Sequence, residues 1–135
     1  RFNMLNHVMV GSNNIAKSKA FYDAVLGVLG AGPAMEHTNS TGQKRLFYVH
    51  NGSTFAISEP INGQPPSSAN GSTIGFACDS PGSVQEFHDV AISNGGKSIE
   101  SAPGLREGND LGDRYLCYFL DPDGHKICGI HRPSN

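Results

Sequence analysis

The stretch NNIAKSKAFYDAVLGVLG, residues 13–30, predicts a helix, and a second stretch later in the chain repeats its organisation. The two asparagines supply an N-cap, apolar residues recur at helical spacing, and Gly30 marks the end. In SPGSVQEFHDVAISNGG, residues 80–96, Ser80 is the N-cap, a proline takes the first helical position, and two glycines stop the helix. An offset of 66 places Phe21 on Phe87, which indicates two copies of one unit.

Strand patterns surround each predicted helix in the same order. The first copy has strands predicted at 5–11, 34–38, 44–50 and 53–59, and the second copy has them at 72–79, 97–101, 114–120 and 125–131. The dipeptide Asn51-Gly52 predicts a two-residue hairpin, and the run DPDG at 121–124 predicts the equivalent turn. INGQPPSSANG, residues 61–71, has the composition of an irregular linker, and APGLREGNDLGD, residues 102–113, has that of a loop. We therefore expect one α+β domain over 1–135, with βαβββ modules at about 4–60 and 72–132.

Composition and charge exclude several classes of function. The 135 residues carry a formal net charge of −2 with no run of like charge, which argues against nucleic acid and membrane surfaces as partners. An apolar stretch of the roughly 18 residues needed to span a bilayer is absent from the sequence, as is the pattern of a secretory signal. Three cysteines without CxxC spacing favour a reducing compartment, so we predict a cytoplasmic protein.

Nearly the whole chain resembles one known family. NHVMVGSNNIAKSKAFYDAVLGVLG (6–30) and YFLDPDGHKICGIHR (118–132) are similar to the opening and closing parts of the vicinal-oxygen-chelate superfamily, the glyoxalase, bleomycin-resistance and extradiol-dioxygenase-like proteins. FAISEPINGQP (55–65), VQEFHDVAISNGG (84–96) and SAPGLRE (101–107) resemble a small bacterial two-module subgroup. The resemblance implies two βαβββ modules forming a concave mixed β-sheet, with helices on the outer face, commonly in a homodimer and often with a divalent metal.

The resemblance also implies four metal-ligand positions, which fall here on His7, Ala56, Thr73 and Cys128. His7 matches the family pattern, but Thr73 replaces a usual histidine, Cys128 replaces a usual glutamate, and Ala56 has no ligand atom. A catalytic divalent site needs about three protein ligands and an open position. We therefore expect no cofactor, with a divalent metal at His7 and Cys128 as the alternative.

Alternation along the strands predicts which side chains line the concave face if His7 points into it. His7 and Tyr115 are the candidate catalytic residues. The candidate ligand-binding residues are Arg45, Ser58, Thr73, Arg106, Cys117 and Lys126. Each also has an ordinary structural reading: a solvated loop arginine at Arg106, for example, or a small apolar residue at Cys117. Outside this set, His88 is expected on the outer side of its helix, and Glu100 is expected to be a rim or surface carboxylate.

The turn at Asp121–Gly124 predicts the register of the last hairpin. If Leu120 faces His125, Cys117 faces Cys128, and both thiols lie on the concave face. The pair would then be either a packing feature or a site for a soft metal ion.

The leading hypothesis is a glyoxalase-like protein that binds a small organic molecule, electrophilic or aromatic, at a degenerate metal site. One alternative is a metal-dependent lyase or dioxygenase-like enzyme that uses His7. Another is a drug-sequestering binder of the resistance type, although a net charge of −2 is small for holding a cationic drug. The sequence leaves the substrate and the reaction open.

Overall fold

The computed structural model describes residues 4–108 and 110–133, and its elements follow the predicted repeat. In chain order they are β1 (His7–Gly11), α1 (Ile15–Gly27), β2 (Met35–Thr38), β3 (Lys44–His50), β4 (Ser53–Ser58), β5 (Ile74–Ala77), α2 (Pro81–Ser93), β6 (Lys97–Ser98), β7 (Gly104–Arg106), β8 (Arg114–Leu120) and β9 (Lys126–His131). The two helices have 13 residues each and begin 66 positions apart. Asn14 and Ser80 cap them as predicted, each accepting a hydrogen bond from the amide three residues on.

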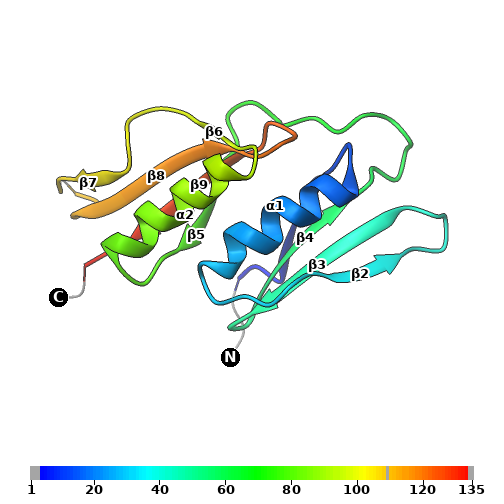
Figure 1. Cartoon of the computed structure of the whole chain (residues 1–135), viewed down its shortest axis with the longest axis horizontal. Helices are drawn as coiled ribbons and strands as arrows, with labels where there is room; N and C mark the ends of the chain where they lie inside the picture. The colour runs from blue at the N-terminus through cyan, green and yellow to red at the C-terminus, as the bar shows by residue number, and fades with distance from the viewer. Residues whose placement is uncertain (1–3, 109, 134–135) are drawn as a thin grey trace.

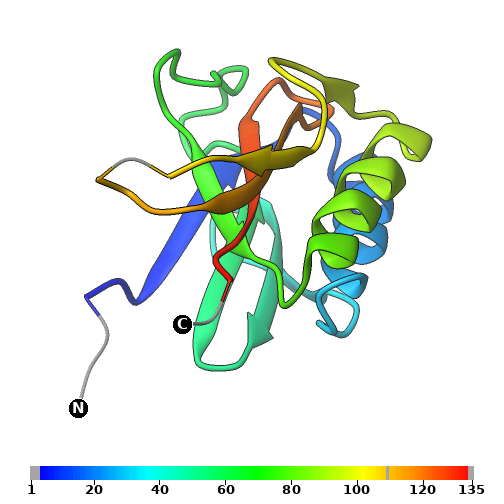
Figure 2. The same ribbon diagram turned by 90° about the vertical axis from the view of Figure 1, so that its left-hand side faces the viewer.

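The strands form two sheets, each with one parallel pair and antiparallel neighbours. The first sheet has the order β1-β4-β3-β2, and the second has β5-β9-β8-β6 with β7 also paired to β8. Both helices lie on the same side of the two sheets (Figures 1 and 2). The α+β class and the helix-covered outer face are thus as expected, with the strands divided between two sheets.

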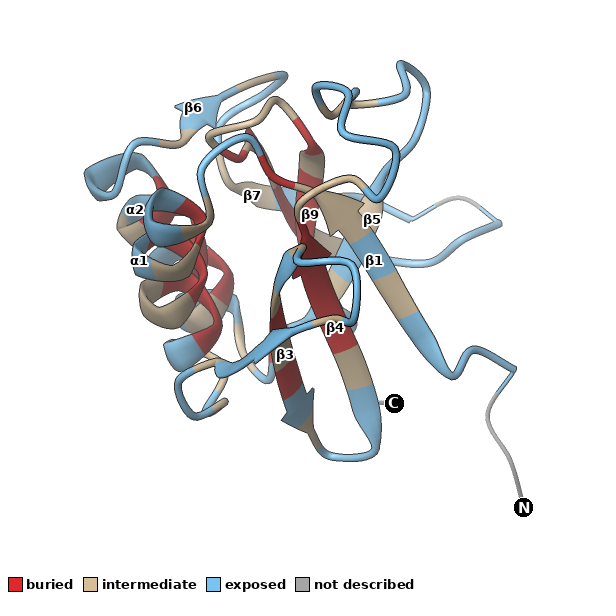
Figure 3. Cartoon of the chain, turned by 90° about the vertical axis from the view of Figure 1, so that its right-hand side faces the viewer, coloured by how far each residue is buried: buried red, intermediate tan, exposed pale blue. Residues whose placement is uncertain are grey.

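An apolar core lies between the helices and the sheets, and the buried residues are the red segments of the ribbon in Figure 3. Phe21 and Phe87, the residues matched by the 66-residue offset, are both fully buried there. Their ring centroids lie 6.0 and 5.3 Å from the ring centroid of Phe119. Phe55 and Phe76, which belong to different modules, have ring centroids 5.2 Å apart. The two modules therefore share one core.

A polar clasp at the DPDG turn also joins the modules. The phenol of Tyr22 on α1 donates to Asp121 Oδ2 at 2.5 Å, and Asp121 Oδ1 accepts the amides of Asp123 and His125. Asp123 in turn accepts the amide of Asn13 at 2.8 Å, just before α1. Because Tyr22 and Asp121 are both buried, this motif serves the fold rather than a ligand.

The same turn overturns the predicted register of the last hairpin. Leu120 pairs with Lys126 rather than His125, so Cys117 faces Gly129 and Tyr118 faces Cys128. The cause is the turn's own hydrogen bonding: Asp121 closes on His125, and Gly124 takes a left-handed φ of 89°. Since side chains alternate with period two, a shift of one residue moves a whole strand face.

Two smaller predictions are also wrong. Residues 102–113 were expected to form a loop, but β7 pairs there with β8. His88 was expected on the outer side of its helix, yet it is buried with Nε2 2.8 Å from Ser98 Oγ on β6. In the part of the chain that the structure describes, neither helix is long and apolar enough to cross a bilayer.

Candidate functional site

The concave face of the first sheet carries the side chains that alternate with the core residues. Val8, Val10, Leu46, Tyr48, Phe55 and Ile57 belong to or pack on the core, so their strand neighbours face the other way. The strand pairing places these concave residues in rows across the sheet. One row contains Met9, Ala56, Phe47 and Met35, and the next contains Gly11, Ser58, Arg45 and His37. Met9, Met35 and Val49 are 40, 61 and 65% exposed, so the face is open and apolar.

The concave face of the second sheet holds a different cluster. Cys128 on β9 lies opposite Tyr118 on β8, and the ammonium of Lys126 lies 4.8 Å from the Tyr118 ring centroid. Lys126 also forms an ion pair with Glu100, which has a left-handed φ of 60°. Burial raises the pKa of the Cys128 thiol, so this sulfur is a protonated thiol at neutral pH.

The four family ligand positions are divided between the two sheets. His7 and Ala56 lie on β1 and β4, whereas Thr73 precedes β5 and Cys128 lies on β9. Among the described strands, no Cα atom of one sheet lies within 8 Å of a Cα atom of the other. The structure therefore does not bring His7 and Cys128 together within one chain.

These residues do not fit a divalent metal ion. His7 is exposed, with Nδ1 2.8 Å from Asn6 Oδ1, and the other three positions offer a methyl group, a hydroxyl and a buried thiol on a different sheet from His7. Over residues 4–108 and 110–133, no three His, Cys, Asp or Glu side chains are grouped as a metal site would require. The donor set of this chain thus lacks the carboxylate and second imidazole expected of such a site.

Two predicted site residues lie on the wrong face. Tyr115 and Cys117 point toward the helices, where Tyr115 packs against the core and Cys117 is fully buried within it. The register shift of the hairpin is the reason. Because of the same shift, the predicted pairing of Cys117 with Cys128 is wrong. Burial raises the pKa of the Cys117 thiol to about 12.

The remaining candidates have varied surroundings. Arg106 donates to the carbonyls of Ser101, Ala102 and Gly104, so a ligand would compete with its own loop. Ser58 is buried and donates to Glu59 O at 2.7 Å, and Thr73 is exposed just before β5. Their ligand roles stay predictions.

Sequence reasoning missed Tyr118 and Glu100 as neighbours of Lys126. The wrong register places Tyr118 on the core face. A turn of three residues that ends at Gly124 would instead have placed Tyr118 on the concave face. Glu100 was read as a rim carboxylate, and no local pattern indicates that its chain segment returns to β9.

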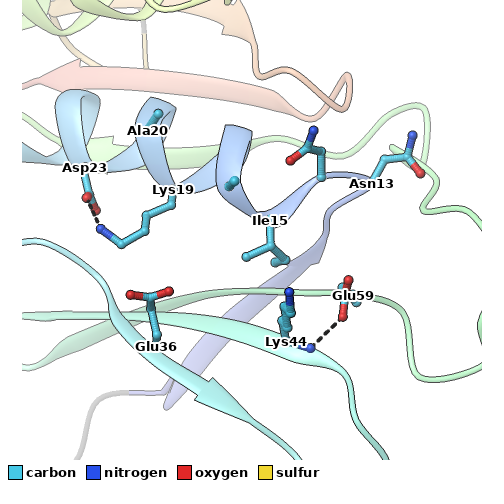
Figure 4. A pocket seen from close by; sticks show the side chains of 10 residues that line it. Asn13, Ile15, Lys19, Ala20, Asp23, Glu36, Lys44 and Glu59 are labelled. Carbon is cyan, nitrogen blue, oxygen red and sulfur yellow. Dashed lines mark hydrogen bonds and ion pairs between the residues drawn. The ribbon is translucent and has the colours of Figure 1, made fainter.

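A groove of about 580 Å³ lies away from both concave faces, between α1 and the strands β2 and β3 (Figure 4). Lys19 and Asp23 form an ion pair of 2.6 Å in its wall, and Glu59 accepts the Lys44 amide at 2.7 Å. Since these lining groups are paired with one another, the groove is best explained as a solvated seam between helix and sheet.

Comparison with known proteins adds the family context. The model of the Glyoxalase/Bleomycin resistance protein/Dioxygenase superfamily matches residues 4–128. A glyoxalase/bleomycin resistance protein from Albidiferax ferrireducens T118 is 50% identical, with a TM-score of 0.88 over 96% of this chain and 100% of that one. No curated protein matches significantly.

More distant structures share the fold alone. The fosfomycin resistance protein FosX from Listeria monocytogenes is 19% identical, with a TM-score of 0.67 over 100% of this chain and 95% of that one. A mutant glyoxalase I from Zea mays is 16% identical, with a TM-score of 0.71 over 93% of this chain and 44% of that one.

Proposed function

Because the chain belongs to the Glyoxalase/Bleomycin resistance protein/Dioxygenase superfamily, we propose that it binds a small organic molecule on its concave sheet faces. The observation that carries the proposal is the apolar row of Met9, Ala56, Phe47 and Met35, in which Met9 and Met35 are exposed and which polar groups border. Pockets for small ligands combine such an apolar floor with a few placed polar side chains.

The chain would thus be a binder with a degenerate metal site. Substitution of three of the four family ligand positions removes the donors that a Lewis-acid mechanism would use. His7 keeps an accessible imidazole on the concave face, so it remains available for hydrogen bonding or proton transfer to a bound molecule.

A second copy of the chain is the expected cover for the concave faces, which gives a homodimer. Exposed Met9, Met35 and Val49 supply an apolar surface that a two-fold contact would bury. Light scattering at micromolar concentration should give twice the chain mass of 14.3 kDa. A monomeric mass would contradict the dimer but leave ligand binding open.

A thermal-shift screen tests the binding function directly. The panel contains aldehydes, thioacetals, catechols and amino-sugar drugs. A ligand that binds the folded protein adds RT ln(1+[L]/Kd) to the free energy of unfolding and thereby raises the Tm. The stabilising compound should lose its effect when Met9, an exposed residue of the apolar row, is changed to Asp. If no class stabilises the protein, the binding function is wrong. Stoichiometric metal in protein purified without chelator would instead favour the His7-dependent enzyme.

A further inference from the structure

Arg45 differs from the other arginines that the structure describes in having no partner for its guanidinium. Arg106, Arg114 and Arg132 each donate to a backbone carbonyl at 2.7–3.5 Å. Within the described residues, Arg45 makes neither a hydrogen bond nor an ion pair, and its Nε is buried. A buried donor without an acceptor is destabilising, so such a group indicates that an acceptor is missing.

The surroundings of Arg45 leave its charge uncompensated. It lies on the concave face of β3, between Ser58 on β4 and His37 on β2. The concave positions of this sheet contain no carboxylate among the described residues. Glu36 and Glu59 are the chain neighbours of His37 and Ser58, but they lie on the other face of the sheet, where they line the groove under α1 (Figure 4). An anion on the concave face would therefore meet one positive charge and no nearby negative strand residue.

The linker closes one end of the row that contains Arg45. A Cβ on Gly11 would lie 2.7 Å from Pro66 Cβ and 3.6 Å from Pro60 Cγ, so this part of the linker packs directly over the strand. Toward the other side, Phe47 follows Arg45 on the same face at about 6.6 Å along the strand. The site thus has a wall, a cation and an adjoining apolar floor.

We propose that Arg45 binds the carboxylate of a small organic acid whose apolar body packs on Met9 and Phe47. A guanidinium binds a carboxylate through two parallel N–H bonds, and a pair formed by Nε and one Nη gives the orphaned Nε its acceptor. Lys126 on the second sheet is less suited, since Glu100 already pairs with it. The inference rests on the proposed concave-face binding function and adds the class of ligand.

Benzoate and its neutral analogue benzamide are the probes that separate the charge from the apolar body. Wild type, R45M, R45K and the control K17M, which removes an exposed lysine of α1, are titrated by calorimetry at constant ionic strength. We expect benzoate to bind wild type and K17M equally, and R45M at least about tenfold more weakly, as for loss of a charged hydrogen bond. R45K should fall between them, and benzamide should bind R45M and wild type alike.

The Nε–H signal of Arg45 in ¹⁵N-labelled protein provides a second readout, which should shift on addition of benzoate and stay unchanged with benzamide. Equal benzoate affinity in R45M and wild type, or equal affinity of benzoate and benzamide, would overturn the carboxylate site while leaving concave-face binding intact. Binding of neither probe would also overturn it, and the broader ligand panel would then decide the proposed function separately. Circular dichroism of R45M and R45K establishes that both variants are folded.

Discussion

Replacement of Tyr22 by Phe should remove the central hydrogen bond of the clasp between the modules. The phenol and Asp121 Oδ2 are 2.5 Å apart, and the two residues are only 1 and 5% exposed. Loss of the hydroxyl leaves Asp121 Oδ2 without its donor, in a place where water has little access. Hydrogen bonds to charged groups contribute about 1.5–3 kcal/mol, so we expect the free energy of unfolding to fall by about 2 kcal/mol.

This loss can be converted to a melting temperature. An unfolding entropy of about 2.1 cal/mol/K per residue gives roughly 0.28 kcal/mol/K for this length, and about 2 kcal/mol then lowers the Tm by roughly 7 °C. Urea unfolding followed by circular dichroism measures the free energy itself.

Tyr48→Phe is the matched control. Tyr48 donates to Asp23 Oδ1 at 2.7 Å, but Asp23 also accepts from Lys19 and the Ala34 amide, and its side chain is 27% exposed. Water can replace the lost phenol there, so Y48F should cost only about 0.5–1 kcal/mol. Equal losses in the two variants would refute the argument from burial.

The pH dependence of the Tyr22→Phe loss gives a second check. Burial raises the pKa of Asp121, while the bond from Tyr22 opposes that rise. Without the phenol, the folded-state pKa rises further above the unfolded value of about 3.9, and a raised carboxyl pKa adds stability as the pH falls through it. The deficit of Y22F should therefore be smaller at pH 4.5 than at pH 7. A deficit independent of pH would indicate a packing defect.

Four further predictions concern Cys117, Gly129 and His7. Burial raises the pKa of the Cys117 thiol to about 12, so this thiol should resist iodoacetamide at pH 8 until urea unfolds the chain. Peptide mass spectrometry measures the alkylation, and rapid alkylation of the native protein would contradict the burial of Cys117. Its thiol should also make stability fall as the pH rises from about 9 toward 12, since only the unfolded thiol ionises in that range. Gly129→Ala should lower the free energy of unfolding in urea by about 1–3 kcal/mol, because the new Cβ would lie 2.7 Å from Phe87 Cδ2 and 2.9 Å from Cys117 Sγ. An unchanged urea midpoint would show that α2 can move away from β9. His7→Ala should leave stability within about 1.5 kcal/mol of wild type, as expected for an exposed side chain, and a larger loss would make it a structural residue.

Local chemistry in the sequence was sufficient for most of the fold. Caps at Asn14 and Ser80 and the glycines after each helix determine where α1 and α2 begin and end, because these bonds form within a few residues. Alternation in β1, β3, β4, β5 and β9 predicted the core face of each strand, since burial of one face dictates period two. The superfamily followed from the same stretches and is confirmed by the match over residues 4–128.

Tertiary structure alone decided the rest of the candidate site. The face of β8 depends on whether the turn between β8 and β9 holds an odd or even number of residues, and the side-chain hydrogen bonds of Asp121 determine that number. The pairing of Glu100 with Lys126, the isolation of Arg45 and the division of the family ligand positions between two sheets are contacts between distant segments. Such contacts depend on how the modules pack, whereas caps and strand alternation depend on neighbours in the chain, which is why only the latter could be predicted from the sequence.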